Sequence, residues 1–196
     1  MLEIDKLSVH FSSFSLHEVS LKVNKGEYLA LLGLSGAGKT VLLELLAGLI
    51  TPVSGRILLN GKDISHHSIQ ERGLGLVYQD MALFPHLKVH QNIAYALHGR
   101  GLSGSSRQNR VHELARLCAC DHLLDRYPET LSGGEARRVA IARTLAAEPR
   151  WLLLDEPLAN LDIDLRSGLR HLLKQIHGQG ISFIHVTHDY ADVATL

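Results

Sequence analysis

The hydrophobic and polar positions alternate between patterns typical of strands and patterns typical of helices. Short apolar or β-branched runs predict strands at residues 2–9, 16–23, 28–32, 56–59, 74–78, 151–154 and 181–186. The runs at Tyr28–Leu32 and Trp151–Leu154 have no polar residue, so we expect both strands to be fully buried.

Helical periodicity fills most of the chain between these strands. We expect a helix over roughly residues 39–48, and a helical region from about Pro85 to Ala147 that a polar glycine-serine loop at 99–106 interrupts. One face of this region carries Val111, Leu114, Leu117 and Cys118. A later amphipathic helix is marked by Leu161, Leu165, Leu169, Leu172, Leu173 and Ile176.

Buried strands separated by helices predict an α/β fold, with a mainly parallel sheet and helices on both of its sides. The first 25 residues are typical of an antiparallel edge. The helices over about 86–147 are expected to form an inserted lobe.

Composition narrows the class of protein. The chain has 196 residues, a formal net charge of +0 and 45% hydrophobic residues, which predicts one ordered domain. The balanced charge argues against a nucleic-acid partner. We expect neither a signal peptide nor a membrane span, because no apolar stretch approaches ~18 residues. The hydrophobic share is high for a free-standing enzyme, so some apolar surface is expected to meet partners.

A glycine-rich loop follows the strand at 28–32. It reads Gly33, Leu34, Ser35, Gly36, Ala37, Gly38, Lys39 and Thr40, and it matches G-x-x-x-x-G-K-[ST] between a strand and a helix. The glycines allow backbone N–H groups to surround a phosphate, and the helix that follows directs its positive end at the same anion. Lys39 is expected to contact the β- and γ-phosphates, and Thr40 to bind Mg²⁺. The loop predicts binding of a nucleoside triphosphate.

Two carboxylates follow the apolar strand at 151–154. Asp155 is placed to hold Mg²⁺ and Glu156 to polarise an attacking water, since parallel sheets bind ligands at the carboxyl ends of their strands. Farther upstream, Ser132, Gly133 and Gly134 open a helix and predict a second anion-binding helix N-terminus. One domain does not need two such sites for one triphosphate.

The sequence Leu131-Ser132-Gly133-Gly134-Glu135, with the helix after it, resembles the signature motif of ABC-type ATPases. The resemblance extends from about residue 2 to 190. It implies a P-loop NTPase core, an N-terminal antiparallel β subdomain, an inserted helical subdomain at about 86–147, ATP and Mg²⁺ as cofactors, and a head-to-tail homodimer. In that dimer, the signature residues of one subunit close over the ATP of the other.

The same resemblance assigns further roles. It implies that Gln79 reaches Mg²⁺ and the attacking water, that Asp162 belongs to the D-loop, and that His188 contacts the γ-phosphate. Phe11 matches the aromatic residue that stacks on adenine, and Phe14 is the alternative. Arg137 stands where many members of the family have glutamine, and we expect it to have little effect on the nucleotide.

The expected function is the ATP-hydrolysing subunit of an importer, peripheral at the cytoplasmic face of the membrane. Transmembrane subunits are expected to contact the Gln79–Leu87 region, and a substrate-binding protein to act indirectly. Residues 36–48, 71–97 and 121–135 are most similar to molybdate/tungstate importers, whose wider relatives handle sulfate, ferric iron, polyamines and sugars. One alternative is a soluble non-transport ABC ATPase of the DNA-repair or translation type, which the zero net charge and the lack of a heptad run oppose. The other is a small P-loop kinase, which the signature motif and His188 oppose.

Members of the family usually continue beyond the switch histidine, so we expect further C-terminal strands to be missing from this chain. Cys118 and Cys120 lie two residues apart, which on a helix directs them about 200° from each other and opposes a shared metal. We expect His66 and His67 to be solvated.

Overall fold

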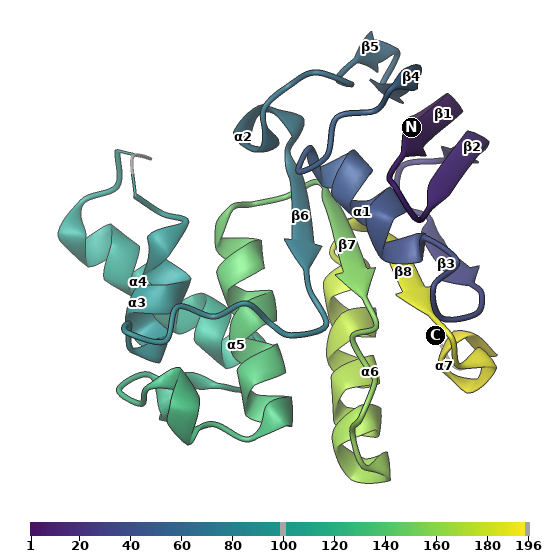
Figure 1. Ribbon diagram of the computed structural model, residues 1–196. Helices are drawn as coiled ribbons and strands as arrows, with labels where there is room; N and C mark the ends of the chain where they lie inside the picture. Colours follow the sequence, from purple (N-terminus) through teal and green to yellow (C-terminus); the bar gives the residue numbers. More distant parts are fainter. Residues whose placement is uncertain (99–100, 195–196) are drawn as a thin grey trace.

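The computed structural model describes residues 1–98 and 101–194, and two four-stranded sheets organise them (Figure 1). The first sheet is antiparallel, with the order β2 (Ser15–Val23), β1 (Leu2–His10), β4 (Ser54–Leu59) and β5 (Lys62–Asp63). The second is parallel, with the order β3 (Tyr28–Leu32), β8 (Ser182–Thr187), β7 (Trp151–Asp155) and β6 (Leu74–Val77). The predicted α/β class is confirmed.

Seven helices lie within the described residues. They are α1 (Lys39–Ala47), α2 (Ile69–Arg72), α3 (Val89–Tyr95), α4 (Gly104–Leu117), α5 (Gly133–Ala146), α6 (Ile163–His177) and α7 (Tyr190–Ala194). Two 3₁₀ turns, Asp121–Leu123 and Pro128–Thr130, separate α4 from α5. Among the described residues, no helix has both the length and the apolar character needed to cross a membrane.

Strand β7 lies inside the parallel sheet and is buried on both faces. Trp151 and Leu153 belong to a hydrophobic cluster with α1 and the antiparallel sheet, whereas Leu152 and Leu154 belong to a cluster with helices α3 to α6. Successive side chains of a strand point to opposite faces, so an unbroken apolar run is what a sheet covered on both sides requires.

Strand β3 differs from the sequence prediction. All its residues are partly or fully exposed, up to 45% for Leu32, so the expectation of a fully buried strand is wrong. The physical reason is its position at the edge of the sheet, where only β8 pairs with it. The expectation of a buried β7 is confirmed.

The predicted N-terminal antiparallel β subdomain is confirmed: the first 25 residues do not form an edge of the parallel sheet. They form a sheet of their own, and the segment predicted as a strand at 56–59 joins it through antiparallel pairing of β4 with β1. Such pairing is non-local, so the periodicity of either segment gives no sign of it.

Two predicted helix boundaries also shift. Helix α4 begins at Gly104, inside the predicted loop 99–106, because Ser103 caps it by accepting a hydrogen bond from Ser106 N–H; residues 99–100 lie outside the described part of the chain. Helix α6 begins after Asp162, so Leu161 precedes it. Leu165 is 39% exposed rather than part of the buried face.

The helices α3, α4 and α5 pack on one another between β6 and β7 in the chain (Figure 1). Helix α5 also packs against β6 and α6, which joins this region to the parallel sheet. The boundaries of the predicted helical subdomain, about 86–147, stay a prediction.

The two cysteines follow α4 rather than lie on it. Cys118 caps the end of the helix and Cys120 lies beyond it, so the argument from helical spacing does not apply to this pair. Both thiols are free and buried, and burial raises both pKa values, that of Cys120 to about 12.

Candidate functional site

The loops that follow the four parallel strands meet at one edge of the sheet. Strand β3 leads into the glycine loop (residues 33–38), β6 into Gln79, β7 into Glu156 and β8 into His188. In Figure 1 the arrows of β6, β7 and β8 point toward this edge. Parallel α/β sheets bind ligands at the carboxyl ends of their strands, so the topology gathers these residues.

The glycine loop leaves the positive end of α1 open. Gly36 and Gly38 have φ of 80° and 88°, values that residues with a Cβ adopt only at a cost. Gly38 is the N-cap of α1 and offers no side chain to the first N–H groups of the helix. Lys39 Nζ donates hydrogen bonds to the carbonyl oxygens of Gly33 and Leu34, at 2.7 and 2.9 Å. The loop therefore presents N–H groups and a cation, the groups that bind a phosphate.

Thr40 and Asp155 face each other across the base of this loop. Thr40 Oγ1 donates to Asp155 Oδ2 at 2.9 Å and lies 3.1 Å from Oδ1. Asp155 is only 4% exposed, and burial raises its pKa; the neighbouring charge of Glu156 adds to the rise, while the Thr40 hydroxyl opposes it. A cation that binds beside this buried carboxylate would stabilise its charged form.

Glu156 and His188 form a second pair. The Nδ1 atom of His188 lies 2.6 Å from Glu156 Oε2, and the histidine side chain is 61% exposed whereas that of the glutamate is 15% exposed. Glu156 has φ of 48°, an unusual backbone conformation for a residue with a side chain. Such outliers occur at functional sites, where the surrounding structure holds them in place.

These residues surround two adjoining cavities. The smaller, of about 230 Å³, is lined by Phe14, Ser35, Gly36, Gly38, Lys39, Thr40, Val41, Gln79, Asp155, Glu156 and Val186. The larger, of about 720 Å³, is lined by Leu32, Gly33, Leu34, Ser35, Gln79, Glu156, His188 and Tyr190. The structure thus brings together the glycine loop, Thr40, Gln79, Asp155, Glu156 and His188, as the sequence predicts.

The donor set fits Mg²⁺ completed by a phosphate ligand. Thr40 and Asp155 supply hydroxyl and carboxylate oxygens, and Gln79 lines the same cavity. Mg²⁺ prefers oxygen ligands and is often held by one or two carboxylates with substrate phosphates and water. Within residues 1–98 and 101–194, no group of three or more His, Cys, Asp or Glu side chains could hold a metal ion.

The two candidate aromatic residues are placed differently. Phe14 lines the smaller cavity and lies so close to Gly38 that a Cβ there would collide with its ring. Phe11 is 44% exposed and lines neither cavity. A backbone hydrogen bond of 2.8 Å from Phe11 N to Phe14 O closes the turn between them.

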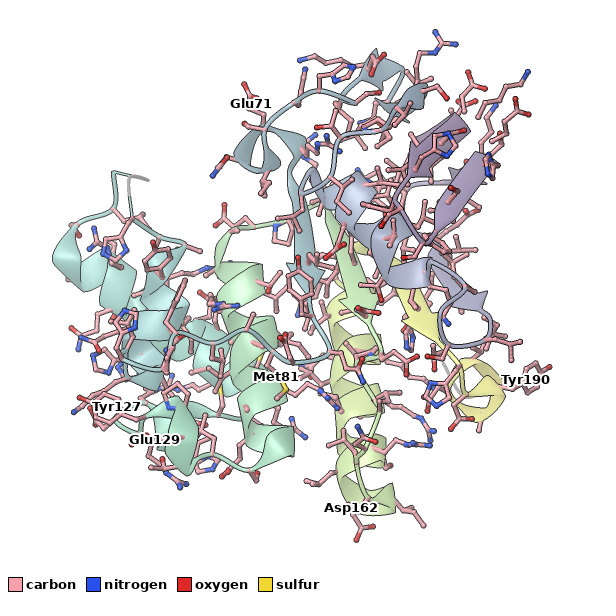
Figure 2. The ribbon with its side chains drawn as sticks, in the orientation of Figure 1. Glu71, Met81, Tyr127, Glu129, Asp162 and Tyr190 are labelled. Carbon is pink, nitrogen blue, oxygen red and sulfur yellow. The ribbon has the colours of Figure 1, made fainter. Side chains whose placement is uncertain are left out.

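The predicted signature residues Ser132, Gly133 and Gly134 line neither cavity. Ser132 and Gly133 are exposed at the start of α5, where Ser132 forms a capping box with Glu135. Asp162 is the exposed N-cap of α6 and accepts a hydrogen bond of 2.8 Å from Leu165 N; Figure 2 shows it at the free end of that helix.

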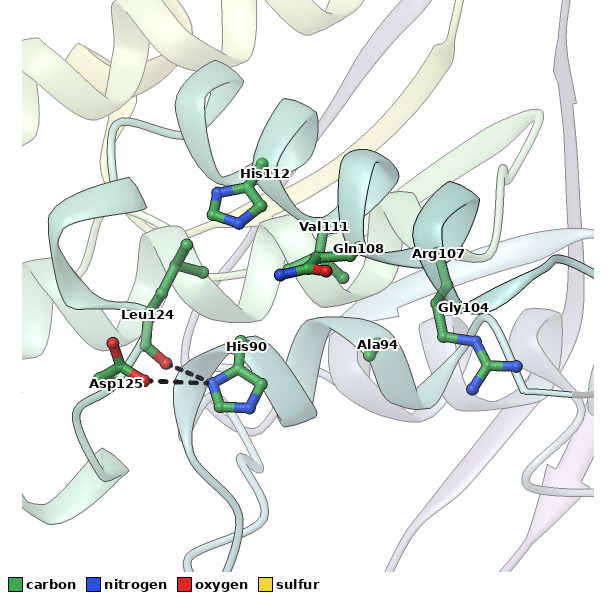
Figure 3. Close-up of a pocket in the computed structure, with 9 residues that line it drawn as sticks. All are labelled: His90, Ala94, Gly104, Arg107, Gln108, Val111, His112, Leu124 and Asp125. Carbon is green, nitrogen blue, oxygen red and sulfur yellow. Dashed lines mark hydrogen bonds and ion pairs between the residues drawn. The ribbon is translucent and has the colours of Figure 1, made fainter.

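A separate cavity of about 510 Å³ lies between α3 and α4 (Figure 3). Arg107, Gln108 and His112 of α4 and His90 of α3 line it, and His90 Nδ1 lies 2.9 Å from Leu124 O and 3.8 Å from Asp125 Oδ1. It shares no lining residue with the two cavities at the glycine loop.

Two residues near the site carry no role in the sequence prediction. Tyr190 lines the larger cavity, is 73% exposed and projects outward from α7 in Figure 2. Arg137 is buried between the Gln79 and Ala159 carbonyls. The only feature of the sequence that could have drawn attention to residue 137 is an arginine where glutamine is common.

Comparisons with known proteins find one matching family and several similar sequences. The family described as "ABC transporter" matches residues 16–159. The molybdate/tungstate import ATP-binding protein WtpC of Pyrococcus abyssi is 45% identical over 100% of this chain and 57% of its own length. The sulfate/thiosulfate import ATP-binding protein CysA of Pseudomonas putida is 45% identical over 96% of this chain and 59% of its own length. This chain therefore spans less than two thirds of each of these relatives.

A solved structure is also similar. It is the dimeric post-hydrolysis state of an ATP-binding cassette bound to ADP and Pi, with a TM-score of 0.88 and 27% identity over 100% of this chain and 91% of that one.

We predict that Asp155→Asn stabilises the ligand-free protein. A carboxyl whose pKa is raised by folding disfavours the folded state as pH rises through its pKa values, and the amide removes that effect. We expect the unfolding midpoint at pH 7 to rise by about 2–4 °C, the effect of roughly 1 kcal/mol in a chain of this size. Differential scanning fluorimetry measures it. Asp125→Asn, which removes the charge of an 89% exposed side chain, should leave the midpoint unchanged. A lower midpoint for Asp155→Asn would contradict the prediction.

We also predict that Phe14→Ala weakens ATP binding more than Phe11→Ala, because the Phe14 ring lies in the smaller cavity. Stacking of a base on an aromatic ring contributes about 1–3 kcal/mol, so the dissociation constant should rise about tenfold or more. Titration with a fluorescent ATP analogue compares the two variants. A larger loss for Phe11→Ala would assign the stacking to Phe11.

Proposed function

Because the chain belongs to the ABC transporter family, we propose that it binds ATP with Mg²⁺ and hydrolyses it as the ATP-binding subunit of an importer. The observation that carries this proposal is the convergence of three groups on two adjoining cavities. These groups are the open end of α1 with Lys39, the Thr40–Asp155 pair and the Glu156–His188 pair.

The glycine loop and Lys39 would bind the phosphates. The ammonium group now donates to the carbonyl oxygens of Gly33 and Leu34, and phosphate oxygens would replace these neutral acceptors with charged ones. Thr40, Asp155 and Gln79 are the oxygen donors available for Mg²⁺, which would neutralise charge on the phosphates.

Glu156 is the candidate for polarising the attacking water. It lines both cavities and directly follows Asp155 in the chain. His188 is within hydrogen-bond distance of Glu156 and is exposed at the rim, where it could contact a γ-phosphate. The pair thus holds the glutamate in one orientation, as a positioned base requires.

A head-to-tail dimer would complete the site. Ser132 and Gly133 are exposed and line neither cavity of their own chain, so they are free to contact a nucleotide held by a second copy. The exposed apolar side chains include Leu34 at the glycine loop, Tyr190 at the larger cavity and Ile163 beside Asp162. These fit burial against a partner, and the similar dimeric cassette supports the proposal.

Transmembrane subunits are the partners proposed for the segment Gln79–Leu87. Ala82, Pro85 and His86 are exposed in this segment, while its backbone is fixed from behind by Asn92 and Arg143. This arrangement would place the chain at the cytoplasmic face of the membrane as a peripheral subunit. A substrate-binding protein would act on it only indirectly.

The transported substrate we propose is molybdate or tungstate, or another small oxyanion such as sulfate. Support comes from the names of the two relatives. The residues around the two cavities fit ATP and Mg²⁺, and none of them is assigned to the transported ion.

Two variants test ATP hydrolysis. We expect Glu156→Gln to retain ATP binding and to lose about 10²-fold or more in kcat, because the amide cannot polarise the water. Lys39→Ala should instead weaken ATP binding about tenfold or more, because one charged donor to the phosphates is lost. Binding of a fluorescent ATP analogue and release of phosphate measure the two effects. Near-normal turnover of Glu156→Gln would exclude this role for Glu156, and unchanged affinity of Lys39→Ala would exclude the phosphate site.

A charge in the proposed membrane-docking segment should prevent assembly. We expect Ala82→Glu to reduce co-purification with the transmembrane subunits about tenfold or more, since an exposed apolar contact becomes charged. Val53→Glu introduces the same charge at a side chain that is 65% exposed and immediately precedes β4, and should retain the complex. Full assembly and transport with Ala82→Glu would contradict this docking site.

A further inference from the structure

Arg137 lies on α5, one turn after the signature residues, and is only 5% exposed. Its guanidinium donates from Nη1 to Ala159 O at 2.8 Å and from Nη2 to Gln79 O at 3.3 Å. Among the described residues no carboxylate forms an ion pair with it. A buried charge without a counter-ion is costly, so its two carbonyl acceptors are important for the local structure.

Both acceptors belong to loops that carry the site. Gln79 itself lines both cavities. Ala159 closes a turn on the residue next to Asp155, since its N–H donates to Glu156 O at 3.2 Å. The carbonyl that Arg137 binds thus belongs to a residue of the same turn as Glu156. Arg137 thus connects the loop of Gln79, which is expected to contact Mg²⁺ and water, to the loop of Glu156, which is expected to polarise that water.

These two loops contain unfavourable backbone conformations. Glu156 and Asn160 have φ of 48° and 59°, and Met81 and Ala82 have φ of 61° and 44°. Residues with a Cβ keep such conformations only where neighbouring groups hold them. Arg143, also on α5, donates to the carbonyl oxygens of Ala82 and Met81 at 2.8 and 3.3 Å. Met81 lies beside α5 in Figure 2.

We propose that Arg137 is a positioning residue that fixes the Gln79 loop and the Glu156–Asn160 loop to each other and to α5. This inference rests on the proposed function for its effect on turnover. The guanidinium is planar and forked, so it donates to two separate carbonyl groups at once. A lysine donates from a single point and glutamine is shorter, so neither replaces both bonds. Arg137 touches neither cavity, and it therefore acts on turnover rather than on ATP affinity.

The test compares Arg137→Met with Arg138→Met in the full chain. Arg138 is the matched control, because it is the next residue of α5 and also donates to a backbone carbonyl, that of Cys118, outside the two loops. Hydrogen–deuterium exchange reports the loops directly. We expect Arg137→Met to increase exchange about tenfold in peptides covering residues 78–82 and 157–161, since fixed carbonyl positions are lost. Arg138→Met should leave both peptides unchanged.

Turnover gives the second measurement. We expect Arg137→Met to lower kcat about tenfold with the dissociation constant for ATP unchanged within about twofold. In the Gln79→Ala variant, Arg137→Met should lower kcat by a smaller factor than it does in the wild type, because Arg137 acts in part through Gln79. Arg137→Lys, which retains a charged donor, should recover part of the activity and replaces Arg137→Met if that variant does not fold.

The outcomes are separable. Unchanged exchange in either loop of a folded Arg137 variant would overturn the proposal, and so would a loss of ATP affinity as large as the loss of kcat. If the losses of kcat caused by Arg137→Met and Gln79→Ala add fully in the double variant, Arg137 does not act through Gln79. A wild-type chain that binds no ATP and hydrolyses none would instead overturn the proposed function, and the exchange measurement would still decide the role of Arg137.

Discussion

Burial of strand β7 on both faces is the constraint on which the rest of the structure depends. Its five residues are all buried, and their side chains alternate between two hydrophobic clusters. One cluster needs α1 and the antiparallel sheet as its cover, and the other needs helices α3 to α6. A strand enclosed in this way ends at a fixed point in space. Asp155, its last residue, is therefore held beside Thr40 without a loop of its own.

This arrangement destabilises the charged form of the carboxylate at the end of the strand. Asp155 is buried with Glu156 next to it, so folding raises its pKa and disfavours its charge. The Thr40 hydroxyl offsets only part of this cost. A bound cation would offset more, and the site is thus better suited to the ligand-bound state than to the free one. Glu156 has a positive φ immediately after the strand, which is a second local cost at the same place.

The parts of the site that could be predicted from the sequence are the functional residues that directly follow, in the chain, the strand or turn that positions them. The glycine loop needs only a strand, a turn and a helix in succession, and Asp155 and Glu156 need only the strand before them. The edge position of β3, the pairing of β4 with β1 and the contact of Phe14 with Gly38 depend on segments far apart in sequence. The contacts of Arg137 are of this second kind, because they join residues 22 and 58 positions away.

Helix α1 is bound by a buried arginine at the end opposite the glycine loop. At its C-terminal end, Arg72 is 2% exposed and donates to the carbonyl oxygens of Leu45 and Leu46, at 2.7 and 2.9 Å. Gly48 is required there, since a Cβ would lie 2.6 Å from Arg72 Nε. The negative end of the helix dipole is thus neutralised by a cation, whereas the positive end at Gly38 has no side-chain cap. Only the end that faces the cavity is left to be satisfied by an anion.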